Sequence, residues 1–316
     1  MDKPRLIAIA GATASGKTNV AVRLCQAIGG EVVSCDSMQV YRGMDIGTAK
    51  PSPREQGGVP HHMLDIVDPM ETYSVSAFRE QAHAAIEDIL ARNRQPVLCG
   101  GTGLYIDALT RPMAFSEQSS EELRAALRNI AEGPDGKTRL HAMLAEIDPE
   151  SARRLHENDT RRVIRAIEIY RLTGRTMTEQ MAIDKAREGD YRVKLFALRW
   201  PRDELYKRID RRVEQMMQAG LVGEVRRLIE RGVSAESTAM QALGYKEIVA
   251  ALENHCTEAE AVEAIKIGTR HYAKRQMTWL RRDGRARWIE AYGKSADEIV
   301  REIVEELEHD TDRTGD

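Results

Sequence analysis

One octapeptide near the N-terminus constrains the fold of this chain more than any other segment. Residues 11–18 fit the pattern GxxxxGK[ST] at every specified position, after a short apolar run at 5–10 and before a helical pattern at 19–27. Between a strand and a helix, such a loop turns its backbone N–H groups around phosphate oxygens, and the helix dipole adds positive potential. The pattern predicts a P-loop that binds a diphosphate, made of Gly11, Ala12, Thr13, Ala14, Ser15, Gly16, Lys17 and Thr18.

Two side chains of this loop carry the predicted chemistry. Lys17 can neutralise a terminal phosphate, and the Thr18 hydroxyl is placed to bind Mg²⁺. We therefore expect Mg²⁺ as the cofactor, held by Thr18 together with the diphosphate and water. The motif does not say whether the diphosphate belongs to ATP.

Further apolar runs predict an α/β fold. The runs at 31–35, 95–99 and 192–198 alternate with helical patterns, which is typical of a parallel sheet with right-handed crossovers. The P-loop, Asp36 and the glycine-rich residues 100–102 each follow a strand directly. Ligands of such sheets bind at the carboxyl ends of the strands, so we expect all three segments to meet in one cleft.

The middle of the chain differs in character from both ends. Residues 116–189 are charged and helical, with no strand-like run before 192. We interpret them as a helical insertion in a P-loop NTPase-like core that comprises 1–115 and 190–316, a parallel sheet flanked by helices. The last part of the core, after residue 200, is again predominantly helical.

Composition bounds the class of protein. The 316 residues carry a formal net charge of −3, and the four cysteines show no ligand-like spacing, which argues against a zinc site or a disulfide framework. No apolar run approaches the length of a membrane span. We expect a cytoplasmic monomer, with His61 and His62 as ordinary loop residues.

Asp36 is the candidate acid–base residue. An NTP-hydrolysing protein usually has a second apolar strand that ends in a Mg²⁺-binding aspartate, but the run at 96–99 leads into Gly100. Asp36 follows the other candidate strand. In a kinase it would accept a hydroxyl proton, and in a different group-transfer enzyme it would act on an amine. A purely structural, helix-capping Asp36 is the remaining alternative.

At this point the sequence resembles one family closely, the tRNA dimethylallyltransferases of bacterial type, also called tRNA isopentenyltransferases. The resemblance spans nearly the whole chain in order, and no motif residue is lost. The long block at 36–51 is far more specific than a P-loop alone. The matching segments are 11–18, 36–51, 60–65, 100–105, 158–168, 244–246 and 269–279.

The resemblance implies a reaction. Dimethylallyl diphosphate would donate its five-carbon group to N6 of adenosine 37 in tRNAs that read codons beginning with U, and diphosphate would leave in the presence of Mg²⁺. The nearest alternative is an adenylate isopentenyltransferase acting on free AMP or ADP. A P-loop kinase and a non-catalytic, nucleotide-dependent RNA-binding module are alternatives from other classes.

The resemblance also implies roles for individual residues. Asp36 would be the general base, Thr102 would help to hold it or the adenine, and Arg212 would contact the diphosphate. Ser37, Met38 and Gln39, beside Asp36, would read the neighbourhood of the extruded adenine. Further tRNA contacts are implied for Arg124, Arg161, Arg162, Val163, Ile164, Arg165, Gln241, Gly244, Tyr245 and Lys246.

Two locally basic segments support an RNA substrate despite the acidic total. One runs from 153 to 175 and the other from 266 to 287, where Asp283 is the only acid among many basic residues. Basic stretches of this kind are the electrostatic footprint of nucleic-acid binding. In the second segment we expect contacts from Arg270, Lys274 and Arg275.

Overall fold

The computed structural model describes residues 3–113 and 120–312. The chain divides into two compact units, Met1–Thr110 with Tyr191–Asp316, and Arg111–Asp190. The helical insertion expected at 116–189 falls within the second unit, and the core expected at 1–115 and 190–316 contains the whole first unit.

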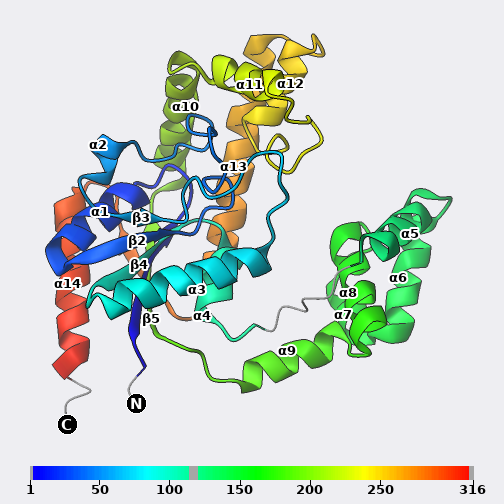
Figure 1. Cartoon of the computed structure of the whole chain (residues 1–316), viewed down its shortest axis with the longest axis horizontal. Coiled ribbons are helices and arrows are strands. Elements are labelled where there is room, and N and C mark those ends of the chain that lie inside the picture. Colours follow the sequence, from blue (N-terminus) through cyan, green and yellow to red (C-terminus); the bar gives the residue numbers. More distant parts are fainter. Residues whose placement is uncertain (1–2, 114–119, 313–316) are drawn as a thin grey trace. The chain divides into compact units, whose positions relative to one another are not determined.

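A six-stranded, all-parallel sheet forms the centre of the first unit in the described part of the chain (Figure 1). Its order is β3-β2-β4-β1-β5-β6, so β1 lies between β4 and β5. This is the P-loop NTPase-like arrangement that the alternating runs predict. The strands are β1 (Arg5–Gly11), β2 (Gly30–Ser34), β3 (His61–His62), β4 (Gln95–Gly100), β5 (Arg192–Arg199) and β6 (Ala286–Glu290).

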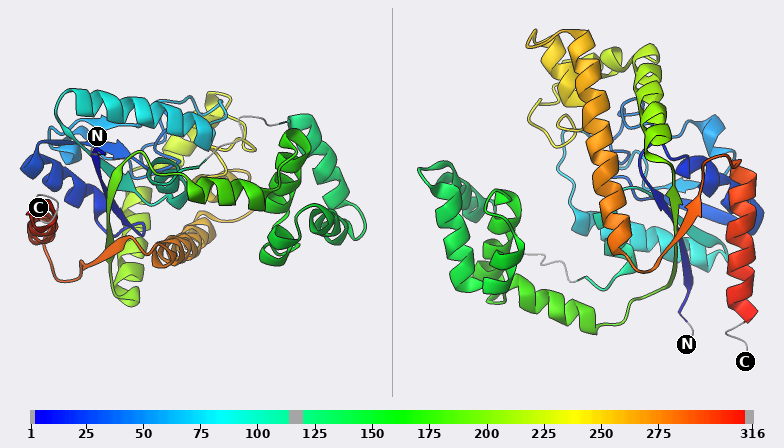
Figure 2. Two further views of the ribbon diagram at one scale, coloured as in Figure 1. Left: turned by 90° about the horizontal axis from the view of Figure 1, so that it is seen from below. Right: turned by 180° about the vertical axis from the view of Figure 1, so that it is seen from behind.

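Helices cover both faces of this sheet (Figures 1 and 2). Ile7 and Ile9 of β1 pack with α1 (Lys17–Ile28) and α14 (Ala296–Asp312) on one face. Leu6 and Ala8 point to the other face, which is covered by α3 (Val75–Ala91), α4 (Gly103–Thr110), α10 (Arg202–Gln218) and α13 (Glu258–Arg282). Because side chains alternate along a strand and both faces are buried, β1 appears in the sequence as an unbroken apolar run.

A third hydrophobic cluster lies under the loop that follows β2. Val40, Tyr41 and Met44 of that loop are buried against α11 (Leu221–Glu230), α12 (Tyr245–Leu252) and the first turns of α13. The loop is therefore ordered by packing, although residues 37–51 contain no helix or strand. The short helix α2 (Pro53–Gln56) comes next, capped by Ser52.

The second unit is helical, as its composition predicts. Its core contains Leu140, Leu144, Val163 and Ile167, all buried. The helices are α5 (Glu121–Glu132), α6 (Gly136–Ile147), α7 (Pro149–Arg154), α8 (Thr160–Thr173) and α9 (Met177–Ala186). None of the helices within 3–113 and 120–312 combines the length and apolarity of a membrane span.

Local backbone conformation sets where two elements begin and end. Strand β3 ends at His62, because Met63 and Asp65 adopt left-handed conformations with φ of 66° and 54° that a strand does not accept. Helix α12 begins at Tyr245, after Gly244 with φ of 97°. Helix α4 was not predicted.

Glu31 of β2 connects the edge strand β3 to the end of α3 through its side chain. Its buried carboxylate accepts hydrogen bonds from Arg92 and lies 2.8 Å from His62 Nε2. The bonds from Arg92, with a smaller contribution from His62, lower the pKa of Glu31 from 4.5 to about 2. A carboxyl group whose folded pKa is depressed stabilises the fold above its unfolded pKa and loses this contribution as the pH falls.

We therefore expect Glu31→Gln to lower the melting temperature by a few degrees at pH 7, and to weaken the loss of stability between pH 4.5 and pH 2. Thermal unfolding followed by circular dichroism over this range measures both effects. Glu87→Gln, at an exposed position of α3, is the control. Identical pH profiles for Glu31→Gln and the unsubstituted protein would contradict the assignment.

Candidate functional site

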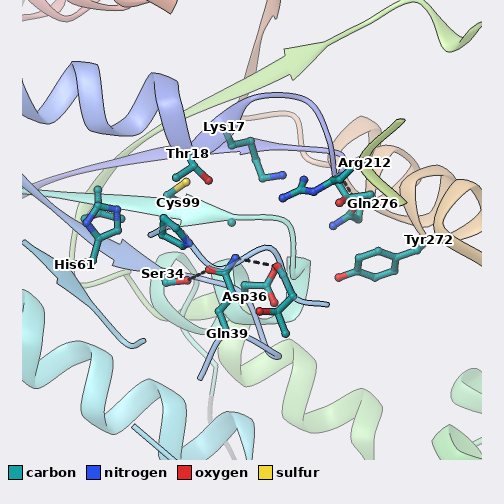
Figure 3. Close-up of a pocket in the computed structure, with 15 residues that line it drawn as sticks. Lys17, Thr18, Ser34, Asp36, Gln39, His61, Cys99, Arg212, Tyr272 and Gln276 are labelled. Atoms are coloured by element: carbon teal, nitrogen blue, oxygen red, sulfur yellow. Dashed lines mark hydrogen bonds between the residues drawn. The ribbon is translucent and has the colours of Figure 1, made fainter. Parts of the chain in front are cut away.

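A pocket lies at the carboxyl ends of the central strands (Figure 3). The P-loop after β1, Asp36 after β2 and Gly100 at the end of β4 all contribute to it, so the three strand ends meet as the topology predicts. Helices α10 and α13 complete the wall. The lining residues are Thr13, Lys17, Thr18, Val32, Ser34, Asp36, Gln39, Thr48, Pro51, His61, Cys99, Gly100, Arg212, Tyr272 and Gln276.

Side chains from outside the P-loop hydrogen-bond to its backbone carbonyls. Trp200 Nε1 donates to the Ser15 carbonyl at 3.0 Å, and Arg208 Nε donates to the Ala14 carbonyl at 2.7 Å. The Arg208 guanidinium also stacks on Trp200, 4.2 Å from the ring centroid. These two bonds fix the carbonyls of Ala14 and Ser15 in place. Neither residue was predicted from the sequence.

Gln276 of α13 connects two walls of the pocket. Its Oε1 accepts from Thr13 N at 2.8 Å, and its Nε2 donates to the Gly101 carbonyl at 3.0 Å. A Cβ on Gly101 would overlap the Gln276 amide, so the glycine is required for this close approach. The P-loop and the β4 loop are thus joined through a side chain from far along the chain.

Two half-buried cations, Lys17 and Arg212, lie at the P-loop end of the pocket. Burial lowers the pKa of Lys17 to about 8, and the nearby Arg212 adds to this effect while Asp36 opposes it. Burial also lowers the pKa of Arg212, against the opposing charges of Asp36 and Glu55. Lys17 Nζ donates to the Ala12 carbonyl at 2.7 Å. A diphosphate placed here would compensate both desolvated charges.

Asp36 lies across the pocket from these cations (Figure 3). Its Oδ1 accepts from Met38 N at 2.9 Å, which orients the carboxylate. Thr102 Oγ1 accepts from Ser37 N at 3.2 Å, so Thr102 supports the turn that carries Asp36. The role that the resemblance implies for Thr102 in holding Asp36 or the adenine stays a prediction.

Tyr272 of α13 is a site residue that sequence reasoning missed. Burial raises its pKa to about 12, and the charge of Asp36 adds to the shift. The phenol is therefore protonated at neutral pH, near Thr102 and Gln276. Its position within the matching block 269–279 was the available signal.

His61 also belongs to the pocket, although we expected an ordinary loop residue. Its Nδ1 lies 2.8 Å from the Val59 carbonyl, so this nitrogen carries the proton. The Nε2 atom is buried and has no hydrogen-bond partner. It is thus an acceptor on the pocket wall, suited to a hydrogen-bond donor such as water.

The pocket contains one protein oxygen expected to bind Mg²⁺, the Thr18 hydroxyl. Within the described ranges, no group of three or more His, Cys, Asp or Glu side chains could hold a metal. Mg²⁺ characteristically binds few protein ligands together with substrate phosphates and waters. Thr18 lies beside Lys17 in the pocket, so the residues present fit a metal ion that arrives with a diphosphate.

In the second unit, the residues implied in tRNA binding divide into two groups. Arg161 and Arg162 of α8 are exposed, whereas Val163 and Ile164 are core side chains. Arg124 Nε lies 2.9 Å from the buried carboxylate of Glu168, and Arg165 Nη1 donates to it at 2.6 Å. Arg124 and Arg165 thus have a structural partner in addition to any RNA contact.

The implied tRNA residues of the first unit divide similarly. Gln241, Lys246, Lys274 and Arg275 are exposed. Arg270 is paired with Asp210, with Nε–Oδ1 at 3.1 Å. Tyr245 is fully buried and Gly244 is buried as well, so the Tyr245 side chain packs inside the protein in this structure and does not face an RNA.

Comparison with known proteins assigns the chain to a family. The family model described as IPP transferase matches residues 39–283. The chain belongs to the IPP transferase family. It is 47% identical over 304 residues to tRNA dimethylallyltransferase 2 of Geotalea uraniireducens, covering 96% of this chain and 97% of that protein.

Solved structures of this family agree with the fold. The full-length tRNA isopentenylpyrophosphate transferase of Bacillus halodurans is 40% identical, with a TM-score of 0.74 over 99% of this chain and all of that one. A eukaryotic dimethylallyltransferase described as acting on tRNA is 32% identical, with a TM-score of 0.79 over 92% of this chain and 74% of its own.

Proposed function

We propose that this chain transfers a dimethylallyl group from dimethylallyl diphosphate to N6 of adenosine 37 in tRNA, releasing diphosphate. The observation that carries the proposal is the meeting of a diphosphate cradle and Asp36 in one pocket of an IPP transferase. The names of its relatives support the substrate pair.

The side chains fit the steps of this reaction. The C1–O bond of the donor breaks as N6 forms a bond to C1, and negative charge develops on the leaving diphosphate. Lys17, Arg212 and the P-loop amides stabilise that charge. Asp36 takes the proton that N6 loses, and Tyr272 keeps its own proton beside it. When bound, Mg²⁺ supplies further positive charge to the diphosphate, with Thr18 as its protein ligand.

A kinase is less compatible with this pocket. Among the residues that line it, Asp36 is the one acid, and β4 ends at Cys99 and Gly100 where a kinase would place a metal-binding aspartate. A single acidic residue suffices for the proposed transfer. The transfer needs one base, for the proton of N6, and the diphosphate leaves as an anion that needs no proton.

The decisive experiment follows a labelled dimethylallyl group. The protein is incubated with labelled dimethylallyl diphosphate and Mg²⁺, together with an unmodified tRNA, with AMP or with no acceptor. We expect label in tRNA alone. Label in AMP would indicate the adenylate-directed alternative. Binding of tRNA without transfer would indicate a non-catalytic module, and phosphate transfer from ATP a kinase.

Arg161 provides a test of the RNA-binding surface. We expect Arg161→Glu to weaken tRNA binding several-fold and to reduce the slope of log affinity against log salt by about 1, as for the loss of one phosphate contact. Binding titrations at several salt concentrations measure both. Arg161 is preferable to Arg165, whose replacement would also remove one of the two arginine partners of the buried Glu168.

Lys185→Glu, at an exposed position of α9 outside the implied contacts, is the matched control. Equal losses of tRNA affinity in the two variants would show that the loss comes from the change in net charge and not from a contact at Arg161. A salt-independent affinity of the unsubstituted protein would argue against a phosphate-binding surface altogether.

A further inference from the structure

A buried carboxylate of helix α11, that of Glu224, binds the backbone of residues 45–47, directly before the pocket residue Thr48. Glu224 is almost completely buried. Its Oε2 accepts from Asp45 N at 3.0 Å and from Ile46 N at 2.9 Å, and its Oε1 accepts from Gly47 N at 3.1 Å. Three successive backbone amides thus converge on one side chain nearly 180 residues away in the chain.

Tyr245 completes this anchor. Its hydroxyl donates to Glu224 Oε1 at 2.6 Å, and its ring packs so closely on Gly47 that a Cβ there would overlap it. Burial, followed by the charge of Glu224, raises the pKa of Tyr245, so the phenol keeps the proton that it donates. The carboxylate therefore receives donors from two sides, as a buried charge requires.

The anchored loop continues directly into the pocket wall. Thr48 and Pro51 line the pocket. Gln39 Nε2 donates to the carbonyls of Thr48 and Ala49 at 3.2 and 3.3 Å, while its Oε1 accepts from Ser34 Oγ at 3.2 Å. Gln39 is thus occupied within the protein and ties the loop to the end of β2.

Lys50 secures the other end of this segment. Its Nζ is nearly buried and donates to the Tyr41 carbonyl at 2.8 Å and to Asp45 Oδ1 at 2.6 Å. Residues 45–51 are consequently fixed at three points, by Glu224, Gln39 and Lys50. The first of these comes from α11, so it ties the segment to a different part of the fold.

We propose that Glu224 and Tyr245 are positioning residues, which set the pocket wall at Thr48 and Pro51 for the transfer step. This inference rests on the proposed function. The proposal gives Tyr245 of the segment 244–246 a role inside the protein. Tyr245 binds Glu224, Glu224 binds residues 45–47, and these residues lead into the pocket wall, so no RNA contact is needed. Neither residue touches the reacting groups.

The test compares Glu224→Gln and Tyr245→Phe with Glu230→Gln, an exposed glutamate on the same helix. Gln has the same shape as Glu but turns an NH₂ group towards backbone N–H donors, whereas Phe keeps the ring contact with Gly47 and loses only the hydroxyl. For Glu224→Gln we expect kcat/KM for dimethylallyl diphosphate to fall about 100-fold, the loss that a displacement near 1 Å can cause. A smaller loss is expected for Tyr245→Phe and none for Glu230→Gln.

Two binding measurements separate positioning from general loosening. The affinities for tRNA and for inorganic diphosphate should stay within about twofold in all variants, because the P-loop and the basic surfaces are untouched. Hydrogen exchange should show faster exchange of the amides at 45–47 in Glu224→Gln. A parallel loss of kcat/KM for dimethylallyl diphosphate, of tRNA affinity and of diphosphate affinity would reveal a merely structural role and overturn the proposal.

Other outcomes also decide the question. Faster exchange at 45–47 with unchanged kcat/KM would show that the wall does not need this anchor. A selective loss of tRNA affinity would return Tyr245 to the RNA-binding set. If Glu224→Gln does not fold, the same readouts on Tyr245→Phe apply. Failure of the proposed function itself is distinct, because the unsubstituted protein would then transfer no label to tRNA.

Discussion

Replacing Asp36 with asparagine is expected to lower the single-turnover rate of prenyl transfer by about 10²–10⁴, the usual contribution of a general base. The exocyclic amine of adenine is a poor nucleophile, and Asn cannot accept its proton. Asn can still accept the hydrogen bond from Met38 N, which Asp36 accepts at 2.9 Å. The turn should therefore survive, and tRNA affinity should change by less than about threefold.

Rapid-quench measurements with enzyme in excess over labelled donor isolate the chemical step. Ser37→Ala is a useful comparison, because it alters the neighbouring residue but leaves the carboxylate and the Ser37 N–H to Thr102 in place. A near-normal single-turnover rate for Asp36→Asn would remove Asp36 from the mechanism. Loss of tRNA binding with a normal rate at saturation would make it a recognition residue.

Replacing Lys17 with methionine should reduce kcat by about 10²–10³, as for the loss of one preorganised donor to a developing anion. Methionine retains most of the apolar stem, so the loss reports the ammonium group. The affinity for inorganic diphosphate should fall as well, because Lys17 and Arg212 are the lysine and arginine that line this pocket. Calorimetric titration with diphosphate measures this effect without requiring turnover.

The pH dependence gives Lys17 a second signature. Its pKa of about 8 means that the ammonium is present below this pH and lost above it. Diphosphate affinity of the free protein should therefore fall as pH rises through 8. The ligand's own titration is common to both proteins, so the difference between the unsubstituted protein and Lys17→Met isolates the lysine. A pH-independent difference would contradict a depressed lysine pKa.

Local patterns sufficed for the sheet and the cradle. The apolar run at β1, the octapeptide and the start of α1 lie next to one another in the chain, so a contiguous pattern predicted their structure. The convergence of the P-loop, Asp36 and Gly100 followed from strand order alone. The helical nature of the second unit followed from its periodicity and charge.

What the sequence could not provide were contacts between distant segments. Trp200, Arg208 and Gln276 fix the P-loop, yet nothing in their local patterns points to residues 13–15. Tyr272 lay within a block assigned to tRNA binding, but its approach to Asp36 depends on how α13 crosses the sheet. Burial was equally invisible, so Tyr245 and Val163 were expected to contact tRNA on the strength of motif position, although both are buried.

The place of β1 in the sheet has a consequence for synthesis on the ribosome. Its partner β5 comes roughly 190 residues later, after the entire second unit, and Gln276 comes later still. At translation rates of about 5–20 residues per second, the edge of β1 that pairs with β5 stays unpaired for roughly 10–40 s. The nascent chain must therefore keep an apolar strand from mispairing during that interval, and no chain truncated before residue 276 can carry a finished phosphate cradle.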